Sequence, residues 1–351
     1  MIPLEQLTEI REKLESSQNP LFFFDNDVDG LCAFLILRRA IDRGKGIAIK
    51  SFPDLKSQYL AKVEELNPDI VFILDKAEVS KEFTIGVEEK GIPIVWIDHH
   101  KSKTAEELSD NISYYNSLPT AEPTTYIAQK IFERKEDLWL AMIGCIGDVY
   151  RPDFAKEFGK TSPELFNPKV SAFESYNTSE IGKLVRMLNF GLMDSTTNVI
   201  NLIKYLCKAK NAYDLLEENK ETKQFHKRYS QLNDFFKKQV VKAEEKFEAS
   251  SPLLFYSYSG NTSMSSEISN ALYYAHQDKT IIVAFKRPEK VNISIRGKKA
   301  LEFTNKLVGN IEGATGGGHI EATGAMIPID EFDKFKERAF ELSKELKTQK
   351  E

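Results

Sequence analysis

Short apolar runs alternate with stretches of helical periodicity along the first part of this chain, and this alternation constrains the fold most strongly. Three apolar runs cover residues 21–24, 70–74 and 92–97, and apolar residues recur at helical spacing over 31–41 and 57–66. Such alternation is typical of βα units that build a doubly wound sheet. We therefore predict an α/β domain with a mostly parallel sheet.

Acidic residues and histidines follow each apolar run, and one more acid follows a strongly apolar helix predicted over 138–147. These residues are Asp25, Asp27, Asp29, Asp75, Asp98, His99, His100 and Asp148. Because the carboxyl ends of parallel strands meet at one edge of a sheet, we expect these side chains to lie together there. Like charges at close range need a cation, a buried proton or bulk water. A divalent ion such as Mg²⁺ or Mn²⁺ would fit, because carboxylate oxygens are its preferred ligands. Taken singly, each residue has a plainer explanation as a turn, a surface histidine or a helix cap.

The length of 351 residues is more than one ordinary hydrophobic core requires, so we predict two domains. The catalytic domain is expected over residues 1–190, and a helical connector over 191–249. A smaller α/β domain is expected over 250–351, with strands at 252–256, 280–285 and 291–295, a helix between the first two strands and a closing helix. Within the connector, the charges of both signs are interpreted as a solvated helix face.

The charge distribution limits the possible partners. A formal net charge of -5 argues against a basic coat for nucleic acid over the whole protein. Residues 279–310, however, contain eight Lys or Arg against two Glu, a local charge of +6 that suits a phosphate backbone. The sequence shows neither an apolar run long enough to cross a bilayer nor a signal peptide, so we expect a cytoplasmic protein without a membrane partner.

The order and spacing of these motifs resemble the DHH phosphoesterase superfamily, in particular its RecJ-like branch with a DHHA1-type second domain. The matching segments are residues 25–30, Asp75, Asp98-His99-His100 and Gly147-Asp148. In the second domain, Gly316-Gly317-Gly318-His319 and the strand that ends at Arg296 match the pattern of the family. Without this resemblance, the glycines would be interpreted as a tight turn between strands.

The resemblance implies a role for each matching residue. Asp27 and Asp75 would hold one divalent ion with Asp25 nearby, and a second ion would be held by Asp29, Asp75, His99 and Asp148. Mn²⁺ is the preferred ion and Mg²⁺ is possible. Asp98 would orient an imidazole, and His100 would contact the scissile phosphate or the leaving oxygen. The substrate-binding residues would be Arg296, Gly316, Gly317, Gly318 and His319.

The sequence departs from the family at two positions. Asn26 stands where many relatives carry His or Tyr, which implies a looser first metal site. Lys76 directly follows a metal-binding aspartate, where it would alter metal affinity or touch the substrate.

The resemblance implies a two-metal phosphodiesterase that acts as a single-strand-specific exonuclease on DNA or RNA, with a metal-activated hydroxide attacking the terminal phosphodiester. Two alternatives remain open. One is a hydrolase of short oligonucleotides or small nucleotides, as in the nanoRNase and pAp phosphatase branch. The other is a non-catalytic replication scaffold, although retention of the acids argues against it. A helicase or a replication or repair protein is a possible partner in each case.

Overall fold

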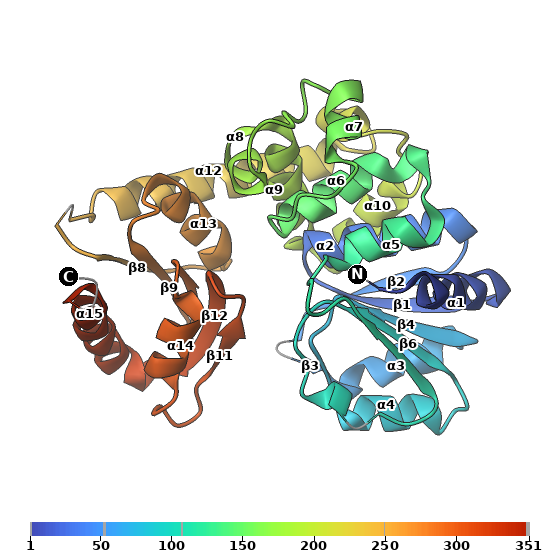
Figure 1. The fold of residues 1–351 in the computed structure, drawn as a ribbon, viewed down its shortest axis with the longest axis horizontal. Coiled ribbons are helices and arrows are strands. Elements are labelled where there is room, and N and C mark those ends of the chain that lie inside the picture. Colours follow the sequence, from blue (N-terminus) through green and yellow to red (C-terminus); the bar gives the residue numbers. More distant parts are fainter. Residues whose placement is uncertain (1, 52–53, 107, 249, 349–351) are drawn as a thin grey trace. The chain divides into compact units, whose positions relative to one another are not determined.

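The computed structural model describes residues 2–51, 54–106, 108–248 and 250–348. The chain divides into two compact units, residues 1–229 and 230–351 (Figure 1). The boundary falls within the long helix α12 (Lys223–Glu244), inside the segment predicted as a helical connector. Each unit has its own sheet and is described separately.

The first unit is built on a five-stranded parallel sheet, which confirms the predicted fold class. The strand order is β2 (Lys45–Ile49), β1 (Pro20–Asp25), β4 (Ile70–Leu74), β6 (Ile94–Asp98) and β7 (Ile112–Asn116). The edge strand β7 was not predicted, because its residues are mostly half-buried and lack a continuous apolar run. A small parallel pair, β3 (Asp54–Leu55) and β5 (Glu78–Val79), lies outside this sheet.

Helices cover both faces of the sheet (Figure 1). Successive side chains of a strand point to opposite faces, so Phe22 and Phe24 pack in one core while Leu21 and Phe23 pack in the other. The first core is closed by α1 (Leu4–Ser16), α2 (Val28–Ile41), α5 (Thr124–Phe132) and α6 (Leu138–Gly147). The second core is closed by α3 (Leu60–Leu66) and α4 (Lys81–Glu88). Strands buried on both faces explain the nearly continuous apolar runs in the sequence.

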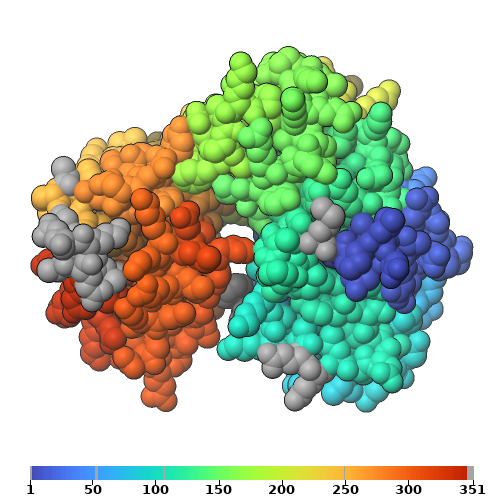
Figure 2. All heavy atoms as spheres, viewed as in Figure 1, coloured from blue at the N-terminus to red at the C-terminus, as the bar shows by residue number. Residues whose placement is uncertain are grey.

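Further helices extend the first core beyond α6, and the last two of them lie in the segment predicted as a helical connector. They are α7 (Ala155–Thr161), α8 (Ala172–Thr178), α9 (Glu180–Leu192), α10 (Thr196–Leu206) and α11 (Tyr213–Leu216). Helix α1, dark blue in Figure 2, lies on the surface of the unit with Ile10 and Leu14 turned into the core. Among the described residues, no helix has the length and apolar character needed to cross a membrane.

The second unit contains a mixed sheet in the order β11 (Thr315–Gly318), β12 (Ala322–Pro328), β10 (Lys290–Arg296), β9 (Thr280–Lys286) and β8 (Leu253–Ser259). Only β8 and β9 pair in parallel among its described strands. Helix α13 (Ser265–Ala275) covers one face, and α14 (Ala300–Val308) and α15 (Phe332–Thr348) cover the other (Figure 1). The sequence predicted β8, β9, β10, α13 and α15, but not β11, β12 and α14.

Candidate metal centre

The candidate centre lies where the strand order of the parallel sheet reverses. Strands β1 and β4 are neighbours, and the chain leaves them toward opposite edges of the sheet. A crevice forms outside the carboxyl ends of strands at such a switch point, and ligands bind there in open α/β sheets. Asp25 ends β1 and Asp75 directly follows β4, so the sequence places both acids at this crevice.

The turn after β1 carries three aspartates into the first turn of α2. Asp27 is the N-cap of α2, and its carboxylate accepts the N–H of Gly30 at 3.0 Å. A Cβ atom at Gly30 would lie 2.7 Å from the backbone oxygen of Asp25, so the close approach of helix and strand requires glycine. The helix-cap alternative for Asp27 is therefore correct, but a cap whose carboxylate lies at the switch point can also face a cation.

Asp29 is fully buried and is held by the beginning of α5. Its two carboxylate oxygens accept the backbone N–H groups of Thr124 and Thr125, each at 2.9 Å, and the hydroxyl of Thr125 donates to the backbone oxygen of Asp29. Free N–H groups at a helix N-terminus favour a negative charge. The two threonines were not identified from the sequence, because no local pattern indicates a contact across 95 residues.

His99 is the point at which the acids from different elements meet. Its Nε2 atom lies 3.2 Å from Oδ1 of Asp75, 3.2 Å from Oδ2 of Asp148 and 3.9 Å from Oδ2 of Asp29. Asp75 adopts a left-handed backbone conformation with φ 57°, and its N–H donates to Ile97 in β6. The sharp turn directs the chain away from β4, with the carboxylate of Asp75 close to the imidazole.

Asp148 reaches the cluster because α6 packs closely on α2. A Cβ atom at Gly147 would lie 2.1 Å from Cγ1 of Val28, so only glycine allows this approach. Asp148 is the C-cap of α6, and the hydrogen bonds from Val149 to Ile146 and from Tyr150 to Cys145 close the helix in a Schellman arrangement. The packing of α6 on α2 therefore fixes the position of the Asp148 carboxylate.

Asp98 and His100 form a second part of the site. Oδ1 of Asp98 lies 2.9 Å from Nδ1 of His100, and its other oxygen accepts the backbone N–H of His100. The His100 side chain is 29% exposed, whereas that of His99 is 2% exposed. Of the two imidazoles, His100 is thus the one that is oriented by a buried carboxylate and accessible to a ligand.

The concentration of buried charge shifts the ionisation of this group. Burial and repulsion from other carboxylates raise the pKa of Asp29 and of Asp75 to about 7 and raise the pKa of Asp27 well above its usual value. Burial alone would lower the pKa of His99, but the hydrogen bond with Asp75 and the charges of Asp148, Asp75 and Asp29 raise it to about 11. Burial would also lower the pKa of His100, but the hydrogen bond with Asp98 and the charge of Asp98 raise it to about 9. The cluster of carboxylates therefore favours the uptake of protons or the binding of a cation.

The donor atoms fit a divalent cation. Oxygen and imidazole ligands of Asp29, His99 and Asp148 lie within 4.8 Å of one another, and the same holds for Asp75, Asp98 and His100. Carboxylate oxygens together with one imidazole suit Mn²⁺ and Mg²⁺. Asp27 lies outside these two groups, although its charge interacts with those of Asp75, Asp25 and Asp148. Asp25 is paired with the Lys76 ammonium at 2.9 Å.

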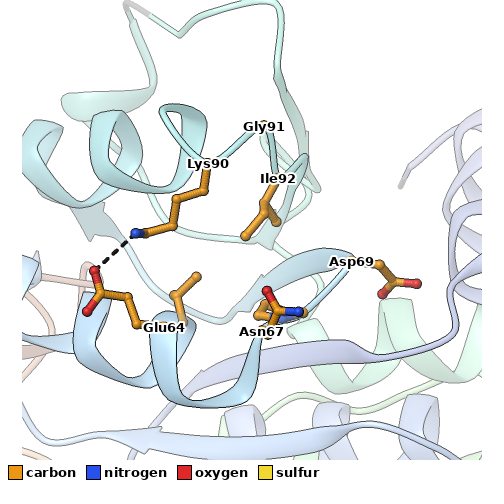
Figure 3. A pocket seen from close by; sticks show the side chains of 8 residues that line it. Glu64, Asn67, Asp69, Lys90, Gly91 and Ile92 are labelled. Carbon is orange, nitrogen blue, oxygen red and sulfur yellow. Dashed lines mark hydrogen bonds and ion pairs between the residues drawn. The ribbon is translucent and has the colours of Figure 1, made fainter.

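A separate hollow lies at the opposite, amino ends of β4 and β6 (Figure 3). Lys90 and Glu64 form an ion pair of 3.0 Å beside it, and Asp69 accepts the N–H groups of Gln18 and Asn19. The acids here are partnered by neighbouring groups of the fold, and the hollow contains no histidine among its described lining residues. The switch point remains the better candidate for chemistry.

The substrate-binding residues expected in the second unit lie on β10 and on the β11–β12 hairpin. Arg296 is buried, and its guanidinium donates to the side chains of Asn270 and Ser266 and to the backbone oxygens of Ile295 and Thr323. These contacts tie the guanidinium to α13 and β12, which the sequence did not indicate.

Gly316, Gly317 and Gly318 form the edge strand β11, and His319 is exposed at the turn that follows. Gly318 has φ 133°, and a Cβ atom there would lie 2.6 Å from the backbone oxygen of Ala322. The last glycine is thus required by the hairpin, as the turn interpretation proposed. The other two lie in the strand itself.

Two family models match the chain. Residues 21–146 match the N-terminal domain of the DHH family, and residues 252–345 match the DHHA1 domain. Together these ranges cover more than half of the chain. A search of curated proteins gave no match.

Several solved structures share the fold. RecJ from Thermus thermophilus in complex with Mn²⁺ aligns with TM-score 0.69 and 14% identity over 98% of this chain and 55% of RecJ, so the chain spans about half the length of that protein. CDC45 from Entamoeba histolytica aligns with TM-score 0.52 and 10% identity over 97% and 98% of the two chains. PggH, a pGpG-specific phosphodiesterase from Vibrio cholerae, aligns with TM-score 0.50 and 13% identity over 93% and 99%. At these identities the alignments establish the fold.

Proposed function

Because the chain belongs to the DHH family and carries a DHHA1 domain, we propose that it is a divalent-metal-dependent phosphodiesterase that degrades single-stranded DNA or RNA from one end. The fold is that of the DHH/DHHA1 phosphoesterases. The dependence on Mn²⁺ or Mg²⁺, the exonuclease activity and the substrate are the parts that the proposal adds.

One observation carries the proposal. Nε2 of His99 lies within 3.9 Å of carboxylates that come from three separate parts of the chain, namely Asp29, Asp75 and Asp148. A helix cap or an acidic turn explains one acid at a time, but neither explains this convergence. We propose these four residues as the ligands of one ion, and Asp27 with Asp75 as the ligands of a second. The structure of Thermus RecJ with Mn²⁺, a neighbour in fold, supports a manganese site of this kind.

The residues around the ions have separate tasks. When bound, divalent ions supply an activated water at neutral pH and stabilise the charge that develops on the phosphate. Asp98 orients the His100 ring through Nδ1, and we propose that this partly exposed imidazole contacts the substrate. We propose that His100, whose pKa Asp98 raises in the metal-free cluster, donates a proton to the phosphate or to the leaving oxygen.

The second unit is proposed to bind the phosphate backbone of the substrate. Its basic segment, residues 279–310, supplies positive charge, and β11 is an edge strand, so one side of its backbone has no partner strand among the described residues. Exposed glycines let backbone N–H groups approach an anion, and His319 adds a donor. We propose Arg296 as a phosphate-binding residue of this unit, where its guanidinium also holds α13 and β12.

The test is digestion of end-labelled single-stranded DNA and RNA and of pAp with Mn²⁺ present. The wild type is compared with Asp148→Ala and with Asp110→Ala, an exposed aspartate that serves as the control. We expect a ladder from one end for the wild type and the control, and no product for Asp148→Ala. Turnover of pAp alone would favour the small-nucleotide alternative. Tight binding of oligonucleotides without turnover would favour the scaffold alternative.

A further inference from the structure

Lys76 places a fixed positive charge inside the carboxylate cluster. Its side chain is 3% exposed, and its Nζ atom lies 2.9 Å from Oδ1 of Asp25 and 3.2 Å from the backbone oxygen of Ser51. Asp25 ends β1, and Ser51 lies just after β2. A lysine that follows β4 thus connects the carboxyl ends of three neighbouring strands.

The backbone of Lys76 is held as firmly as its ammonium group. Its carbonyl oxygen accepts the indole N–H of Trp96 at 2.8 Å, and the N–H of the preceding Asp75 donates to Ile97. Both partners belong to β6, in the interior of the sheet. Since the main chain is anchored and the side chain is buried, the surrounding fold restricts the ammonium to the neighbourhood of Asp25.

A held ammonium affects the neighbouring ion sites unequally. Asp25 is the acid that would complete the first ion site beside Asp27, and here it is engaged by Lys76. A cation at ion-pair distance also repels an incoming divalent ion, and this repulsion is strongest at short range and low dielectric constant. Around His99, by contrast, the donor atoms of Asp29, His99 and Asp148 lie within 4.8 Å of one another.

Building on the proposed function, we infer that Lys76 is a positioning residue. Its ammonium group supplies part of the positive charge that the first metal ion would otherwise supply. It holds Asp25 out of metal coordination and compensates charge in the cluster. The protein then binds one divalent ion tightly and a second one, beside Asp27, much more weakly. The tight site consists of Asp29, Asp75, His99 and Asp148.

The simpler explanation is that Lys76 only ties the strand ends together. Both explanations expect Lys76→Met to lower the thermal stability, because the variant loses a buried ion pair. Only a role toward the metal changes the affinity of one ion and not of the other. The stepwise dissociation constants for Mn²⁺ therefore separate the two explanations.

The experiment is a calorimetric titration of the metal-free full chain with Mn²⁺. Wild type is compared with Lys76→Met and with Lys90→Met, which removes the surface pair with Glu64 at the other end of the strands (Figure 3). We expect the two constants of the wild type to differ by at least tenfold. In Lys76→Met the weaker ion should bind at least tenfold more tightly, and the tighter one should change by less than threefold. The constants of Lys90→Met should equal those of the wild type.

Two wild-type constants within threefold of each other, or an unchanged weaker constant in Lys76→Met, would overturn the inference. If Lys76→Met does not fold, the electron paramagnetic resonance spectrum of the wild type decides. One equivalent of Mn²⁺ should give the spectrum of isolated ions, and a magnetically coupled pair at that ratio would overturn the inference. A different result would contradict the proposed function itself, namely that the wild type binds no Mn²⁺ tightly.

Discussion

Nδ1 of His100 lies 2.9 Å from Oδ1 of Asp98, and the same carboxylate accepts the backbone N–H of His100. Asp98 is fully buried, and His100 is partly exposed. The pair therefore consists of an interior acid that orients an accessible imidazole. This arrangement gives the first prediction.

Replacing Asp98 with Asn should lower the pKa of His100 from about 9 toward the ordinary value, because the hydrogen bond to a charged acceptor and its Coulombic attraction are lost. Activity should fall by roughly 10–100-fold, as is common when the partner of a site histidine is removed. Proton NMR titration of the His100 ring measures the first effect. An unchanged pKa would show that other charges, such as that of Asp75, dominate.

The metal-free protein should become less stable as the pH rises from 5 to 9. A group whose pKa is higher in the folded than in the unfolded protein stabilises the fold at low pH, and this contribution is lost as the pH rises through the folded pKa. Folding raises the pKa of Asp29 and of Asp75 from 3.8 to about 7. It raises the pKa of His99 from 6.5 to about 11 and that of His100 from 6.5 to about 9. All four contributions have the same sign in this window.

Thermal unfolding in chelator, followed across that pH range, measures the effect. A Mn²⁺ concentration that is 100 times the dissociation constant at pH 7 should add about 2.7 kcal/mol of stability at 25 °C. At the same concentration the gain should grow with pH, because protons compete with the ion and the dissociation constant falls. A melting temperature that increases toward pH 9 without metal would contradict the assigned shifts.

Val149 carries a strained backbone next to Asp148. Its φ is 55°, a left-handed conformation that costs a branched residue about 1–2 kcal/mol. Replacing it with Gly should remove this strain, and after the entropic cost of glycine the protein should gain up to about 1 kcal/mol in urea unfolding. The matched control is Val241→Gly in the exposed part of α12, which should instead lose about 1 kcal/mol. A loss of stability in both variants would count against strain at Val149.

Gly147→Ala should separate α6 from α2. The added Cβ would lie 2.1 Å from Cγ1 of Val28, so one helix must move, at a cost of about 1–3 kcal/mol. Because Asp148 caps this helix, affinity for Mn²⁺ should fall together with stability. Gly260→Ala is the control, since its nearest neighbour would be 3.8 Å away. If Gly147→Ala lost stability but kept its Mn²⁺ affinity, the packing of α6 would not position Asp148.

The sequence predicts those parts of the fold and site that depend on local patterns. Apolar runs such as 70–74, buried on both faces, are visible as continuous stretches, and the acids that follow them mark the strand ends. The half-buried strand β7 and the glycine strand β11 have no such signal, and neither was predicted. Long-range contacts are equally invisible. The threonines that hold Asp29 lie 95 residues away, and the engagement of Arg296 with Asn270 depends on how α13 packs against the sheet.

The most direct test of the account is a crystal of the full chain soaked in Mn²⁺ and measured at the manganese absorption edge. We predict an anomalous peak enclosed by Asp29, Asp75, His99 and Asp148, with Nε2 of His99 at roughly 2.0–2.2 Å from it, typical of metal–imidazole bonds. A soaked crystal without manganese at this position, or with manganese bound elsewhere only, would contradict the central claim.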